Sequence, residues 1–307
     1  ALAATSGYNA HELSLIDLES RTVVARQSVR QSWFGLVCDP KAGKVWWSGG
    51  GSGIRHVFEI KGTDLARVGE PEPGASTKKT EKKSAKKAAE KKAEPHHFAS
   101  GLTLSPDAKT LYALDIDAGT LQIVDATSGE TRQSAHVATR PYDVALARNG
   151  ARLYVSDWSG RAVLAVSSSD LRVLAKISVG EHPTQIAAHP TDNRLFVACA
   201  SSNCVSVIDT GRGVVTETIM TSLFPKAPEG STPDALTVAP DVKTLYVANA
   251  DNNCVAVIDI AEPGRSQVKG FIPTGWYPTA VAVTPDGKSL LVGVGKGNQT
   301  KPNPFEN

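Results

Sequence analysis

The chain has 307 residues, of which 41% are apolar and 21% charged, and its net charge is +2. This length and apolar content allow one domain with a substantial core. The stretch 77–95 holds eight Lys and three Glu, so the rest of the chain is mildly acidic, at −3. That balance argues against a nucleic-acid-binding body with a basic face, and the apolar runs have the length of strands instead of membrane helices.

One pattern recurs from Trp46 to Leu290: a short apolar strand, a Pro-Asp or Asn-Gly turn, and a second strand rich in Leu, Tyr and Val. The copies read CDPKAGKVWWS, SPDAKTLYALD, ARNGARLYVSD, HPTDNRLFVAC, APDVKTLYVAN and TPDGKSLLVGV. Aligned on their second strands, at Val45, Leu111, Leu153, Leu195, Leu245 and Leu290, they are 66, 42, 42, 50 and 45 residues apart. Periods of about 40–50 residues with frequent turns predict an all-β fold, a β-propeller with one four-stranded blade per repeat.

The repeat from His182 to Ile219 shows all four strands of a blade. PTQIAAH and RLFVACA are the first two, CVSVID alternates as the third, and VVTETI is the outer strand. The third strand ends in an Asp in four repeats, at Asp17, Asp125, Asp209 and Asp259. We interpret these carboxylates as structural, because Asp readily accepts backbone N–H bonds in the tight turn that follows.

The two ends of the chain predict incomplete blades. LAATSGYNAHELSLIDL and RTVVARQSV match second, third and fourth strands, whereas TAVAVTPDGKSLLVGVGKG matches a first and a second strand. Five complete and two partial blades favour a seven-bladed propeller over residues 1–307. A six-bladed ring, closed by pairing strands from the two ends, is the alternative. Since unpaired strand edges promote aggregation, we expect the full gene product to be longer.

The Lys-rich segment 74–96 accounts for the long first spacing. Its Lys, Ala and Glu residues form a low-complexity insert between the second and third blades, which predicts a solvated tether. Contact with a nucleic acid or another acidic surface, through charge alone, is the alternative.

The strand LYVAN and its variants LYVSD and LFVAC resemble the bacterial YVTN-repeat β-propellers. The segments SWFGLVCDPKAGKVWWSGGG and GFIPTGWYPTAVAVTPDGKSLLVGVGKG narrow this to the N-terminal propeller of exported proteins that also carry an alkaline-phosphatase-superfamily phosphoesterase domain. The resemblance implies a periplasmic or extracellular location and a phosphoesterase beyond Asn307. It therefore implies a non-catalytic binding or scaffold module, and we expect no catalytic activity from this chain alone.

A candidate binding face follows from the repeats. The residues that precede the first strand of each blade and the loops that join second to third strands should share one face, at the mouth of the central channel. A small polar ligand or a protein partner would contact this face, whose candidate residues are Trp33, Asp115, Arg140, Tyr142, Asp157, Trp158, His182, Asp234, Asn249 and Tyr277.

No cofactor, metal or catalytic residue is predicted from motifs. The seven histidines are scattered over different repeats, and no nucleophile elbow, P-loop or haem-attachment motif is present. The alternative function is a lactonase-like or other metal-dependent hydrolase, for which Asp115, Asp157 and Asp234 are the candidate carboxylates.

The four cysteines lack the spacing of a zinc site or a disulfide framework. Cys204 and Cys254 occupy equivalent positions in neighbouring repeats, so we interpret them as strand residues. A bridge from Cys199 to Cys204 across a hairpin is the less favoured alternative.

We predict that the Lys-rich insert is dispensable for folding. Deleting Thr77 to Glu94 should change the free energy of unfolding by about 1 kcal/mol or less, because loop closure depends weakly on length. Thermal unfolding at two ionic strengths measures this. A large loss at low salt that shrinks at high salt would instead show that the insert docks on the acidic body.

Overall fold

The computed structural model describes residues 1–7, 10–69, 96–224 and 230–298. The chain divides into two compact units, Ala1–Ser100 and Gly101–Asn307. In the described part of the chain, no helix has the length and apolar character needed to cross a membrane. The predicted insert 74–96 lies almost entirely outside the described residues, so its role as a tether stays a prediction.

The first unit contains two antiparallel sheets. One has three strands, β1 (Leu2–Gly7), β2 (Ala10–Asp17) and β3 (Thr22–Ser28). The other has four, β4 (Leu36–Asp39), β5 (Lys44–Ser48), β6 (Arg55–Lys61) and β7 (Asp64–Val68). Their facing apolar side chains form one buried cluster around Trp47 and Phe58, neither of which is exposed to solvent.

The second unit continues the repeat. Its first sheet has β8 (Ala99–Leu104), which begins in the first unit, with β9 (Thr110–Asp115), β10 (Thr120–Asp125) and β11 (Thr131–His136). The second has β12 (Pro141–Leu146), β13 (Arg152–Asp157), β14 (Ala162–Ser167) and β15 (Val173–Ser178). The third has β16 (Pro183–Ala188), β17 (Arg194–Cys199), β18 (Cys204–Asp209) and β19 (Val214–Met220).

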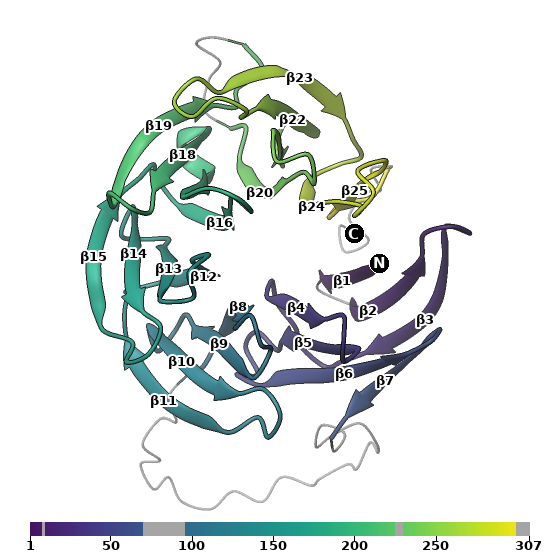
Figure 1. The fold of residues 1–307 in the computed structure, drawn as a ribbon. Helices are drawn as coiled ribbons and strands as arrows, with labels where there is room; N and C mark the ends of the chain where they lie inside the picture. The colour runs from purple at the N-terminus through teal and green to yellow at the C-terminus, as the bar shows by residue number, and fades with distance from the viewer. Residues whose placement is uncertain (8–9, 70–95, 225–229, 299–307) are drawn as a thin grey trace, which may run out of the picture. The chain divides into compact units, whose positions relative to one another are not determined.

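The last full sheet has β20 (Pro233–Val238), β21 (Thr244–Asn249), β22 (Cys254–Asp259) and β23 (Gln267–Pro273). It is followed by the hairpin of β24 (Pro278–Val283) and β25 (Leu290–Val294). Within this unit the first strands β12, β16, β20 and β24 lie side by side along the inner edges of their sheets, and β15, β19 and β23 form the outer edges (Figure 1).

The fold is an all-β propeller of four-stranded blades, as the repeats predicted. Among the described residues, five sheets have four strands and β1–β3 has three, which corresponds to six blades, the alternative in the sequence analysis. The preferred count of seven is not confirmed. β24 and β25 form a two-stranded sheet, without the third and fourth strands that a further blade requires.

The aspartates at the ends of third strands have the predicted structural role. The Oδ1 atom of Asp125 accepts hydrogen bonds from the N–H groups of Thr127 and Ser128, both at 2.8 Å. Asp209 accepts them in the same way from Gly211 and Arg212. These bonds lower the pKa of Asp125, because they stabilise its charged form.

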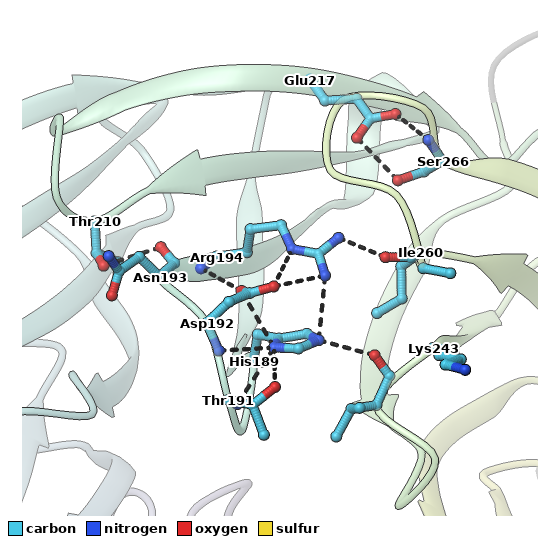
Figure 2. A network of polar contacts seen from close by, with 12 residues as sticks. His189, Thr191, Asp192, Asn193, Arg194, Thr210, Glu217, Lys243, Ile260 and Ser266 are labelled. Atoms are coloured by element: carbon cyan, nitrogen blue, oxygen red, sulfur yellow. Dashed lines mark hydrogen bonds and ion pairs between the residues drawn. The ribbon is translucent and has the colours of Figure 1, made fainter.

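Neighbouring blades of the second unit are joined by a polar network (Figure 2). Apolar side chains also pack across the same blade boundary. The guanidinium of Arg194 on β17 donates to the carbonyl of Ile260 in the next blade at 2.6 Å and to Asp192 at 2.8 Å. His189 contacts the Val242 carbonyl through Nε2 at 2.9 Å, and its Nδ1 accepts the Asp192 N–H at 3.1 Å. Arg194 and His189 are both buried, so this network satisfies polar groups that water does not reach.

We expect Arg194→Ala to lower the free energy of unfolding by about 2–4 kcal/mol, because it leaves a buried carbonyl and the Asp192 carboxylate without their charged partner. Urea unfolding measures the loss. The matched control is Arg172→Ala on the exposed Arg172–Asp170 pair, which should cost about 0.5 kcal/mol or less. An equal loss of unfolding free energy in the two variants would show that the network around Arg194 stabilises the fold no more than an exposed ion pair.

Candidate functional site

A β-bulge follows the leading proline of each first strand from β12 to β24. The register shifts between Pro141 and Val144, between Pro183 and Ile186, between Pro233 and Ala235, and between Pro278 and Ala280. A bulge removes residues from the regular ladder and re-aims their side chains. Tyr142, Asp143 and Asp234 all lie within these bulges, at the inner edge of the second unit.

The residue before each of these prolines, which we term the pre-strand residue, is fixed by the same backbone hydrogen bond in all four repeats. Its carbonyl accepts the N–H that follows the second strand of its own blade: Trp158 to Arg140, Ala200 to His182, Ala250 to Thr232 and Gly295 to Tyr277. Pre-strand residues and second-to-third loops therefore share one face of this unit, as predicted. We call it the pre-strand face.

Three pre-strand residues adopt a left-handed backbone. The φ angles are 49° at His182, 49° at Thr232 and 59° at Tyr277. Residues with β-branched or bulky side chains rarely adopt this backbone conformation, which costs about 1–3 kcal/mol per residue. Residues in such conformations cluster at functional sites. In each case a side-chain contact to the adjoining loop accompanies the strained backbone.

One group on the pre-strand face is aromatic and cationic. The rings of Trp158 and His182 stack at 4.0 Å between centroids, with 23° between their planes. The Arg140 guanidinium lies 5.7 Å from the centre of the Trp158 ring. His182 Nδ1 is 2.6 Å from the Ser201 hydroxyl. This stack spans two neighbouring blades.

A second group is acidic and phenolic, and it contains Tyr142, Asp234, Asp251, Tyr277 and Lys296. Burial raises the pKa of Asp234 to about 6, and the nearby charge of Asp251 adds to the shift. Burial, followed by the charges of Asp234 and Asp143, raises the pKa of Tyr142 above its usual range, so its phenol keeps its proton. The Lys296 ammonium lies 4.2 Å from the centre of the Tyr277 ring.

Asp143 is the most buried carboxylate near this group, and it joins two blades. Its Oδ2 accepts the N–H of Ile186 on the next blade at 2.9 Å, and its Oδ1 accepts the N–H of Val144 at 2.8 Å. Burial nevertheless raises its pKa to about 7. The two bonds satisfy N–H groups at bulges, which gives Asp143 a structural role.

Gln185, at the same position one blade later, also binds a backbone N–H of the following blade: its Oε1 accepts the Leu236 N–H at 2.7 Å. One blade earlier the same position is Gly101. A Cβ at Gly101 would lie 2.7 Å from the Cα of Asp143 and 2.9 Å from its Oδ1. Glycine therefore leaves the room that Asp143 requires.

The remaining predicted residues have structural contacts. Asp115 Oδ1 accepts the Ala118 N–H, and Asp157 Oδ1 accepts the Arg140 N–H. Asn249 is fully buried and donates to the Thr221 carbonyl at 2.7 Å. Trp33 lies in the first unit, edge-on to Phe98 at 5.3 Å. The predicted residues that the structure brings together are thus Arg140, Trp158 and His182 in one group, and Tyr142, Asp234 and Tyr277 in the other.

The metal variant of the lactonase hypothesis does not fit these side chains. In the described ranges, no three His, Cys, Asp or Glu side chains lie together as ligands for a metal ion. Two of its three candidates, Asp115 and Asp157, bind backbone N–H groups in their own blades. We therefore assign no step of a reaction to a bound metal.

Sequence reasoning did not identify Asp143 as a candidate. A signal was available, since PYDVAL places an acid inside an otherwise apolar first strand, where the later repeats have Gln or Ala. Asp251 and Lys296 lie in loops that follow second strands, and only the structure shows that they lie close to Asp234 and Tyr277.

We predict that Asp143 makes stability fall as the pH rises from about 4 to about 7. Its pKa is raised in the folded protein, so the native state holds a proton in this window that the unfolded chain has lost. Asp143→Asn removes this titration, so the stability of the wild type relative to the variant should decrease from about pH 4.5 to about pH 7.5.

Urea unfolding of both proteins at the two pH values tests this. Asp241→Asn is the control, because burial raises the pKa of Asp241 but the hydrogen bonds in its turn and the charge of Lys243 together lower it by more. Its wild-type carboxylate contributes stability that is lost only as the pH falls below the usual pKa of Asp, so the stability of the wild type relative to this variant should stay nearly flat between the two pH values. A relative stability for Asp143 that is flat or rises with pH would contradict the prediction.

Comparison with solved structures supports the fold. A chain of hydrazine synthase from Kuenenia stuttgartiensis is 30% identical over 62% of this chain, with a TM-score of 0.56, and the match spans only 54% of that chain. Candidate 6-phosphogluconolactonases from Bacteroides uniformis and Bacteroides fragilis are each 15% identical, with TM-scores of 0.64 and 0.62. The match to the Bacteroides uniformis protein covers 89% of this chain and 81% of that protein. The match to the Bacteroides fragilis protein covers 91% of this chain and 82% of that protein. At that identity they show the fold alone.

No curated protein sequence matches the chain. One protein-family model matches the chain. Its description is SMP-30/Gluconolactonase/LRE-like region, and it matches residues 99–290, which is more than half of the chain. This match overturns the main functional hypothesis, the non-catalytic scaffold, and favours its lactonase-like alternative. The scaffold interpretation was wrong because it relied on a resemblance that places the hydrolase outside this chain and on the absence of short catalytic motifs, whereas a propeller site is assembled from residues of several blades. The chain belongs to the SMP-30/gluconolactonase/LRE-like family.

Proposed function

We propose that the chain is a lactonase-like hydrolase, which opens a cyclic ester with water. Family membership supports the reaction class. The observation that carries the proposal is Asp234, a half-buried carboxylate in the bulge of β20 whose pKa is raised to about 6. A carboxylate with that pKa is mostly ionised at neutral pH, yet it is more basic than an ordinary Asp. General bases work best when their pKa lies near the working pH.

The residues support a hydrolytic sequence in which Asp234 moves the proton. Its carboxylate accepts a proton from a water molecule as the water oxygen attacks the lactone carbonyl carbon. The tetrahedral intermediate then collapses, the ring C–O bond breaks, and the proton held by Asp234 passes to the departing ring oxygen. The product is a hydroxy acid, and Asp234 returns to its ionised form.

Tyr142 is suited to the developing negative charge on the carbonyl oxygen. Its raised pKa keeps the phenol protonated, so it acts as a hydrogen-bond donor. A donor held in place before the reaction stabilises an oxyanion without reorganisation. Lys296 adds a positive charge to this group, next to the Tyr277 ring.

We expect Asp234→Asn to reduce kcat/KM for lactone hydrolysis by about 10²- to 10⁴-fold, the usual contribution of a general base. Acid release from a panel of five- and six-membered lactones measures the rate. The control is Asp241→Asn, which removes an acid from the turn at the opposite end of β20 and should leave kcat/KM unchanged. Wild-type turnover that survives Asp234→Asn unchanged would eliminate Asp234 as the base, and absence of turnover on every lactone would refute the proposal.

The pH profile gives an independent prediction. Because Asp234 must be ionised, kcat/KM should rise with pH through about 6. The charge of Asp251 contributes to the raised pKa of Asp234, so Asp251→Asn should move this rise to lower pH. Initial rates of both proteins across the acidic range test it. A rise at the same pH in the variant would show that Asp251 does not act on the base.

The narrower family resemblance stays a prediction. The LYVAN-like strands and the GWYPTAV segment support membership among YVTN propellers, and the same resemblance supports a phosphoesterase domain elsewhere in the gene product. A periplasmic or extracellular location depends on that resemblance alone. The reading frame on both sides of this chain and fractionation of the native protein test these points.

A further inference from the structure

Cys199 and Cys204 face each other across the turn between β17 and β18. Cys199 is the last residue of β17, Cys204 is the first of β18, and the two are direct cross-strand partners. Such partners have Cα atoms about 4.5–5.5 Å apart in antiparallel sheets. That distance lies within the range of about 4.4–6.8 Å that disulfides span.

The surroundings of the two thiols bring them together and activate one of them. Cys199 is fully buried and Cys204 nearly so. The Cys199 sulfur lies 3.6 Å from the Ser206 hydroxyl. Hydrogen bonding from Cys204, and then from Ser206, lowers the pKa of Cys199 to about 7. The thiolate is the reactive form in disulfide exchange.

The turn between these cysteines holds part of the pre-strand face. Ala200–Ser202 form a single 3₁₀ turn, and Asn203 follows with a left-handed backbone. The Ser202 hydroxyl accepts the N–H of Glu181 at 2.7 Å, and Ser201 contacts His182 at 2.6 Å. A covalent link at the base of this turn would restrain the residues that hold His182.

We propose that Cys199 and Cys204 are a modification site, a reversible disulfide that closes the turn 200–203 and restrains the pre-strand face at His182. The oxidant is a low-molecular-weight disulfide, which reaches the buried Cys199 sulfur when the turn 200–203 opens locally. The Cys199 thiolate attacks one of its sulfur atoms and releases a thiolate, which leaves a mixed disulfide on Cys199. Cys204 then loses its proton and attacks the Cys199 sulfur, releasing the second thiol. Two protein thiols are oxidised and one external disulfide is reduced to two thiols.

The chain contains its own matched control. Cys254 occupies the position of Cys204 in the next blade, but its cross-strand partner is Asn249. It is also nearly fully buried and follows an Asn in the same turn. A reaction that depends on the paired geometry should modify Cys199 and Cys204 and leave Cys254 as a thiol.

The test uses the full chain in glutathione buffers of increasing oxidised fraction, with free thiols alkylated under denaturing conditions. Trypsin releases both cysteines in one peptide, 195–212, so the disulfide appears as that peptide without alkylation and lighter by two hydrogen atoms. We expect this species in the wild type, alkylated Cys254 throughout, and a glutathione adduct on Cys199 in Cys204→Ser. Alkylation of Cys199 and Cys204 at every buffer ratio would overturn the proposal, and so would a bridge to Cys38 or Cys254.

Hydrogen exchange on the wild type tests the restraint itself and does not depend on a variant that folds. Backbone amides of residues 200–203 should exchange more slowly in the oxidised protein than in the reduced protein. Equal exchange would refute the restraint of the turn. Neither measurement uses lactone hydrolysis, so the outcome is independent of the proposed reaction.

Discussion

The bulge after the leading proline of each first strand is the constraint on which the inner edge of the second unit depends. A regular strand would pair every residue in this stretch with the second strand, and its side chains would alternate strictly between the two faces of the blade. The bulge instead takes Tyr142 and Asp143 out of register on β12, and Asp234 on β20. It also alters the pairing of nearby N–H groups, which the side chains of Asp143 and Gln185 bind across the blade boundary.

Four aspartates of this unit have different roles because their surroundings differ. Asp115 and Asp157 are the last residues of second strands, and they fix nearby backbone by accepting the N–H groups of Ala118 and Arg140. Asp143 is satisfied by two N–H groups but is so deeply buried that its pKa is still raised to about 7. Asp234 is half-buried, and burial together with Asp251 raises its pKa to about 6. Of the four, Asp234 combines solvent access with raised basicity, which is what a general base requires.

On the pre-strand face, residues with a strained backbone also make side-chain contacts to the neighbouring loop. His182, Thr232 and Tyr277 have left-handed backbones, and each contacts a loop residue of its own blade: Ser201, Asp251 and Lys296. The backbone bond from each pre-strand carbonyl to the end of the second strand stabilises this geometry. Asn253 adds a further restraint, since its Oδ1 accepts the Tyr277 N–H at 2.8 Å. The sequence Asn-Cys occurs at the start of the third strand in two repeats, at 203–204 and 253–254. At 253 its Asn helps to position the strand that follows.

The sequence alone determined the propeller, because hydrophobic alternation and turn residues recur with a fixed period and each blade is built from local strand pairing. It also determined the turn aspartates, such as Asp125 and Asp209, whose partners lie two and three residues away. Only the tertiary structure decided the site. Asp143 and Ile186 are 43 residues apart, and Tyr142 and Asp234 are separated by two blade boundaries. Their proximity, and the desolvation that shifts their pKa values, arise when the inner strands pack together, which no local pattern encodes.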